Sequence, residues 1–196
     1  MKKYLSLSLS VVVTLIILTL PAYAENFYLS GDIGSTFSSN LNINGRSGNT
    51  AAQQTLKAGI NIEGAFGMRF DNFRVEGEVA YQPQKLDSTV FNGNVHIASF
   101  LANGYYDFYK EGIQPYVTAG IGVGWHTNDL YPGGQWISGR LEKLAYQLGA
   151  GVAIPVGNNI WLDARYRYFA LTSVTEDSFS YTPSNNSFLL GLRVGL

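Results

Sequence analysis

Residues 73–82 read FRVEGEVAYQ, and apolar and polar side chains alternate along this stretch. A period of two is that of a β-strand, whose successive side chains point to opposite faces. The stretch therefore predicts a strand with one apolar and one polar face. The apolar set is Phe73, Val75, Gly77, Val79 and Tyr81, and the opposite set is Arg74, Glu76, Glu78, Ala80 and Gln82.

The same alternation recurs in both directions from this stretch. Each segment is about ten residues or longer, the length that a tilted strand needs to cross the hydrocarbon of a membrane. Segment 95–108 is ambiguous, and we assign Phe100 and Tyr106 to its apolar face. The eight expected strands lie at about 26–35, 58–70, 73–82, 95–108, 114–125, 141–154, 160–171 and 186–196.

The connections between these strands alternate in length. Short turns are expected at 71–72, 109–113 and 155–159, where Asn, Gly and Pro occur. The other connections are long and polar, at about 36–57, 83–94, 126–140 and 172–185. Short turns at one end and long loops at the other are typical of outer-membrane barrels, with the turns in the periplasm. The sequence thus predicts an all-β fold, an eight-stranded antiparallel up-and-down transmembrane β-barrel.

Alternation alone does not say which face points outward, because a soluble ligand-binding barrel such as a lipocalin turns its apolar face inward. Two observations favour the lipid-facing arrangement. The less apolar face is rich in small residues, which suit a narrow lumen: Gly67, Ala80, Gly120, Gly122, Gly124, Gly149, Gly151, Gly191 and Gly195. Aromatic residues gather near both ends of the strands, as in interfacial girdles: Phe70, Phe73, Phe108, Tyr109 and Trp161 at the turns, and Tyr81, Trp125, Tyr168 and Phe188 at the loops.

This orientation predicts a charged lumen. An unpaired charge in a narrow interior is costly, whereas carboxylates and guanidinium groups satisfy each other. We therefore expect a plugged interior held by ion pairs rather than an open channel. The inward acids are Asp32, Glu63, Glu76, Glu78, Asp107 and Asp163, and the inward bases are Arg69, Arg74, Lys143, Arg165, Arg167 and Arg193.

The N-terminal residues have the pattern of an export signal. Lys2 and Lys3 precede an apolar run over 5–20, and Ala22 and Ala24 form a small-x-small cleavage site. We expect a signal peptide over 1–24 and a barrel domain over 25–196, with an uncleaved anchor as the alternative. Only 14% of the residues are charged, against about 25% in soluble domains. The net charge of −1 does not indicate a nucleic-acid-binding protein.

Four motifs resemble those of one family. They are NGYYDF at 103–108, IQPYVTAGIG at 113–122, AYQLGAG at 145–151 and LDARYRY at 162–168. In this order they resemble the opacity-protein and surface-antigen family of small outer-membrane barrels. The resemblance implies an eight-stranded barrel with variable surface loops, acting as an adhesin or surface antigen, and no enzyme. Such proteins commonly end in Phe, whereas this chain ends in Leu196, so insertion by the barrel-assembly machinery is expected to be less efficient.

The search for chemistry gives no catalytic, cofactor-binding or metal site. His96 and Ser99 are three residues apart, which places them on opposite faces of a strand. Glu76 and Glu78 share one face, and we interpret them as structural partners of the lumen arginines. The aromatic segment 131–136 is a candidate contact patch or a loop tip at the lipid interface.

The primary hypothesis is a non-enzymatic outer-membrane surface protein of a Gram-negative bacterium. Its expected partners are outer-membrane lipid, lipopolysaccharide, the barrel-assembly machinery and a host or matrix ligand bound through the loops. A small permeation barrel for a minor solute is the alternative, and an outer-membrane hydrolase acting on lipid or peptide is a third.

Overall fold

Eight strands close into one antiparallel barrel in the order β1-β12-β9-β8-β7-β6-β5-β4, which confirms the predicted fold class. The computed structural model describes residues 26–38, 41–45, 50–54, 58–85, 92–131, 137–172, 174–176 and 179–196. The barrel strands are β1 (Phe27–Ser38), β4 (Gly59–Phe70), β5 (Phe73–Lys85), β6 (Asn92–Asp107), β7 (Gln114–Tyr131), β8 (Ile137–Gly157), β9 (Ile160–Leu171) and β12 (Ser184–Gly195).

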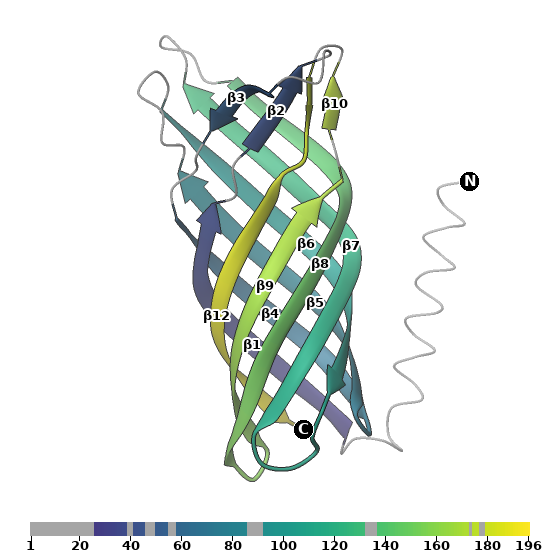
Figure 1. The fold of residues 1–196 in the computed structure, drawn as a ribbon. Coiled ribbons are helices and arrows are strands. Elements are labelled where there is room, and N and C mark those ends of the chain that lie inside the picture. The colour runs from purple at the N-terminus through teal and green to yellow at the C-terminus, as the bar shows by residue number, and fades with distance from the viewer. Residues whose placement is uncertain are drawn as a thin grey trace, which may run out of the picture.

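The first and last barrel strands close the cylinder. β1 pairs with β12 from Tyr28↔Gly195 to Ser38↔Asn185, and its other edge pairs with β4. Because both edges of β1 are occupied, the sheet closes on itself and none of its eight strands is an edge strand. The strands are tilted and the C-terminus lies at the end with the short turns (Figure 1).

Tight turns join the strands at that end. Asp71 takes a positive φ of 59° between β4 and β5, a conformation that Asp tolerates better than most residues. Gly112 has a φ of 64° in the connection between β6 and β7. The predicted turn over 155–159 was too long, because β8 continues to Gly157 and β9 begins at Ile160.

The opposite end is more ordered than predicted. The expected loop over 126–140 was wrong for most of its length, because β7 extends to Tyr131 and β8 begins at Ile137. The expected loops over 36–57 and 172–185 contain short strands that form a second sheet, in the order β10-β11-β2-β3, above the barrel (Figure 1). These strands are β2 (Leu41–Gly45), β3 (Thr50–Gln54), β10 (Val174–Glu176) and β11 (Phe179–Tyr181).

The apolar face of the barrel strands points outward. Val79 is 57% exposed, whereas its sequence neighbour Glu78 is 1% exposed. The ambiguous segment follows the same rule, because Phe100 is exposed and Ser99 is buried. Inner-face Gly122 lies so close to the next strand that a Cβ would stand 2.0 Å from the Phe100 carbonyl oxygen. In the described residues, no helix is both long and apolar enough to cross a membrane.

The prediction that Trp161 belongs to an interfacial girdle is wrong. Trp161 lies between outward-facing Ile160 and Leu162, so the alternation of the strand turns it inward. There it packs against Tyr105, Tyr116 and Ala153. The other aromatic residues predicted at the turn end, Phe70, Phe73, Phe108 and Tyr109, are exposed on the barrel.

Candidate functional site

The middle of the lumen holds a layer of paired charges, which we call the arginine layer: Glu63 on β4, Glu78 on β5, and Arg165 and Arg167 on β9. Glu63 accepts a hydrogen bond from each arginine. Glu78 lies 3.6 Å from Arg165 Nη1 and 3.4 Å from Arg167 Nη2. The two carboxylates thus share two guanidinium groups, and all four side chains are buried.

Amide side chains satisfy the carboxylates further. Asn61 Nδ2 donates to Glu63 at 2.7 Å, and Asn103 Nδ2 donates to Glu78 at 2.8 Å. Gln147 Nε2 donates to Glu78 at 3.1 Å and to the side-chain Oδ1 of Asn103 at 2.7 Å. The layer therefore joins residues from five strands into one network, in which a buried charge retains several partners.

A second cluster lies closer to the turn end, around Arg74 on β5. Arg74 Nε lies 2.9 Å from Asp107, and Arg74 Nη1 lies 3.3 Å from Glu76. The Tyr28 hydroxyl donates to Glu76 at 2.6 Å, and the Arg74 guanidinium stands 4.2 Å from the centroid of the Tyr105 ring. Glu76 and Glu78 thus each pair with arginines, Glu76 with Arg74 and Glu78 with Arg165 and Arg167.

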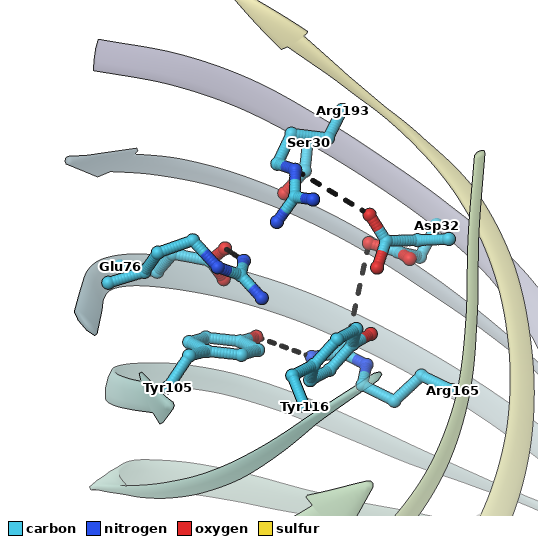
Figure 2. A pocket seen from close by; sticks show the side chains of 9 residues that line it. Ser30, Asp32, Glu76, Tyr105, Tyr116, Arg165 and Arg193 are labelled. Atoms are coloured by element: carbon cyan, nitrogen blue, oxygen red, sulfur yellow. Dashed lines mark hydrogen bonds and ion pairs between the residues drawn. The ribbon is translucent and has the colours of Figure 1, made fainter. Parts of the chain in front are cut away.

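Tyr105 connects the two clusters, because its hydroxyl accepts a hydrogen bond from Arg165 Nη1 at 2.6 Å and its ring contacts Arg74. Figure 2 shows Asp32, Glu76, Arg165 and Arg193 projecting from different strands toward one small cavity. Arg165 Nη2 lies 3.8 Å from Asp32, and Arg193 Nε lies 3.8 Å from Asp163. The cavity has a volume of about 10 Å³, which is room for about one water molecule.

Arg69 departs from the expected pairing. Its Nη2 lies 3.5 Å from the Gln114 side-chain oxygen, and its guanidinium stands 5.0 Å from the centroid of the Trp161 ring. Within the described part of the chain, no carboxylate lies within ion-pair distance of Arg69. Of the other eleven predicted lumen residues, Lys143 has no described carboxylate within ion-pair distance. The remaining ten each meet a described group of opposite charge: Asp32, Glu63, Arg74, Glu76, Glu78, Asp107, Asp163, Arg165, Arg167 and Arg193.

The loop end of the lumen is filled differently, and sequence reasoning missed it. Six buried apolar side chains pack together inside the barrel above the arginine layer. Phe169 and Leu171 lie on the inner face of β9 because they continue the alternation that begins with Asp163. We call this cluster the apolar plug: Val95, Ile97, Leu101, Ala145, Phe169 and Leu171.

The candidate catalytic pair does not come together. His96 stacks on Tyr81 on the outer face, with 2.9 Å between its Nδ1 and the Tyr81 hydroxyl, whereas Ser99 is buried on the inner face. Across the described residues, no group of three His, Cys, Asp or Glu side chains could hold a metal ion. The aromatic patch over 131–136 lies outside the described residues except for Tyr131, whose backbone belongs to β7.

A closed eight-stranded barrel with an apolar outer face and a charged, filled interior defines a small integral outer-membrane protein. The family described as the outer membrane protein β-barrel domain matches residues 10–194, and the chain belongs to it. The chain is accordingly a protein of the Gram-negative outer membrane.

Two known proteins show how far the similarity extends. Outer membrane protein PagN of Salmonella typhimurium is 28% identical over 118 residues, which make up 50% of this chain and 49% of PagN. The match therefore spans about half the length of this curated relative. The crystal structure of Neisserial surface protein A is 20% identical, with a TM-score of 0.58 over 87% of this chain and 97% of the other. The second comparison establishes the shared fold.

Proposed function

We propose that this protein is a non-enzymatic surface barrel of the adhesin or surface-antigen type. Its lumen is closed to solutes, and its long connections make the external contacts. The observation that supports the proposal is the presence of two buried clusters inside the barrel, the arginine layer and the apolar plug. A barrel that is blocked inside acts through its outer surfaces, because those are the surfaces that other molecules reach.

Closure follows from the contents of the lumen. Passage of a solute would require at least Glu63, Arg165 and Arg167 to separate, and a separated buried pair costs several kcal/mol. Above them, Phe169 and Leu101 are fully buried. Two cavities lined by described residues measure about 10 and 40 Å³, which is room for single waters or small groups of them.

Single-channel recording tests the closed lumen. The refolded chain is inserted into planar bilayers, and its insertion is verified by heat-modifiable migration in gels. We expect no stable conductance steps in the wild type. A double variant with Glu63→Ala and Arg165→Ala removes the core of the arginine layer and provides the matched comparison. Stable steps in the wild type would favour the permeation alternative.

The structured end of the barrel supports the surface role. The strands β2, β3, β10 and β11 form their own sheet above the barrel, at the end opposite the short turns (Figure 1). Backbone pairing holds loop residues in a defined arrangement, which favours specific binding because less conformational entropy is lost on contact. A rigid sheet at this position is suited to recognise a host surface or matrix component.

Loop replacement tests this role. Residues 41–54 and 174–181 are replaced by short Asn-Gly turns, and attachment of expressing bacteria to cultured epithelial cells and to matrix-coated plates is counted. We expect attachment to fall to the level of a strain without the protein. Replacing only 86–91 provides the control, and equal attachment by both variants and the wild type would contradict an adhesive role for the sheet. Turnover of lipid A or peptide substrates by the refolded chain would instead favour an enzyme.

A further inference from the structure

Two arginines flank one tryptophan at the turn end of the lumen. The Arg69 guanidinium stands 5.0 Å and the Arg193 guanidinium 5.2 Å from the centroid of the Trp161 ring. We call these three residues the mouth cluster. They come from β4, β12 and β9, so the closure of the barrel brings them together from distant parts of the sequence.

Hydrogen-bond donors in this cluster lack acceptors. Arg193 is 1% exposed, yet its Nε and Nη1 atoms have no hydrogen-bond partner. The indole Nε1 of Trp161 is also buried without a partner. Buried donors are nearly always satisfied, and an orphaned charged donor is especially costly. Arg193 and Trp161 line one cavity together with Arg69, so their unpartnered donors point to an acceptor that the described side chains do not supply.

The local charge indicates the sign of that acceptor. Asp163, at 3.8 Å from Arg193 Nε, is the one carboxylate that pairs with the mouth cluster among the described residues. Arg74 engages Asp107 and Glu76. Among the described residues, one carboxylate thus stands within ion-pair distance of the two guanidinium groups, which leaves the mouth cluster with a net positive charge.

A cavity of about 40 Å³ lies between these groups. Its lining combines the mouth cluster with Asn26, Phe27, Tyr28 and Gly195. This volume accepts one small ion or a few waters, and it is too small for an organic solute. We propose that the mouth cluster binds a single inorganic anion of halide size, which enters from the periplasmic side. The anion accepts the unpartnered hydrogen bonds at the turn end of the lumen.

Fluorescence of Trp161 tests this site directly. Trp125→Phe and Trp136→Phe leave Trp161 as the sole tryptophan of the folded full-length barrel in detergent micelles. The probe is bromide, titrated at constant ionic strength against gluconate, which is too large to enter. We expect quenching that saturates, because bromide occupies one defined site beside the indole. Neutral acrylamide should instead give a linear response.

Arg69→Gln is the decisive variant, because Arg69 is partly exposed and makes no described ion pair whose loss would unfold the barrel. We expect it to raise the bromide dissociation constant by about tenfold, the effect of losing one charge-assisted hydrogen bond. Arg140→Gln, at the opposite end of the barrel, is the matched control and should leave the constant unchanged. Heat-modifiable migration verifies that each variant is folded.

Two results would overturn the proposal. The first is linear bromide quenching of equal slope in the parent and in Arg69→Gln, which would assign the donors to water. The second is bromide quenching that saturates in the Glu25→Gln variant but not in the parent. In that case the acceptor would be the carboxylate of Glu25, the first residue of the predicted mature chain.

Discussion

The arginine layer and the apolar plug fill neighbouring sections of the same lumen by opposite means. Arg167 and Phe169 are two residues apart on β9, and the Arg167 guanidinium stands 4.8 Å from the centroid of the Phe169 ring. One section buries charges that satisfy each other, and the other buries apolar side chains. The charged section depends on the presence of each partner, whereas the apolar section depends on the total volume of its side chains.

Glu63→Gln should have the largest effect, because this carboxylate bonds to both Arg165 and Arg167. The substitution keeps the shape and removes the charge, which leaves two buried guanidinium groups with one close carboxylate between them. We expect the free energy of unfolding to fall by about 3–5 kcal/mol, measured by guanidinium titration in lipid vesicles. Glu142→Gln on the outer face is the control. A loss below about 1 kcal/mol for Glu63→Gln would show that the layer does not depend on its charges.

Leu101→Ala should weaken the apolar plug by about 3 kcal/mol, because the fully buried side chain leaves a cavity that its neighbours fill only in part. Leu101→Met, which nearly conserves the volume, should cost less than about 1.5 kcal/mol in the same titration. Equal losses for the two variants would contradict the statement that volume determines the stability of this section.

Val79→Arg places a positive charge on the outer face of β5, opposite the inward face that carries the arginine layer. Val79 faces outward beside inward Glu78, and at this position an arginine has acyl chains for neighbours instead of carboxylates. We expect a loss of about 2 kcal/mol in vesicles, with Val79→Leu as the neutral control. An unchanged unfolding free energy would indicate that this face does not contact lipid.

Lys110→Ala should have the smallest effect. Its ammonium group pairs with Asp71, but the two side chains are 55% and 71% exposed at the turn end. Water screens such a pair, so we expect a change below about 1 kcal/mol. A loss as large as that of Glu63→Gln would mean that burial does not distinguish the lumen pairs from the surface pair.

Most of the fold was predictable because one physical signal repeats in all eight strands. The alternation at 73–82 placed Val79 outside and Glu78 inside, and the structure agrees. Trp161 was misassigned because its aromatic character was weighed above its position between Ile160 and Leu162. The apolar plug was missed because Phe169 is as apolar as a lipid-facing residue. Apolar character alone does not distinguish the loop end of the lumen from the lipid-facing surface.

The sequence predicts that Glu63, Glu78, Arg165 and Arg167 face the lumen together with other charges, but it does not predict which of them pair. Which carboxylate meets Arg165 depends on the stagger between β4, β5 and β9, and this stagger is set by the closure of the whole barrel. The second sheet was missed for a similar reason. Its strands are short and polar, and β2 and β11 are far apart in the sequence although their backbones pair.

This pairing has a consequence for how the surface of the protein can diversify. Phe179 and Ser180 of β11 pair with Gly45 and Asn44 of β2, so the first and last long connections form one folded unit. An insertion in one of them displaces the hydrogen-bonding edge that the other requires. Variants that escape recognition at this surface should therefore carry matched changes in both connections, and grafting either connection alone into a related barrel should leave an unpaired strand.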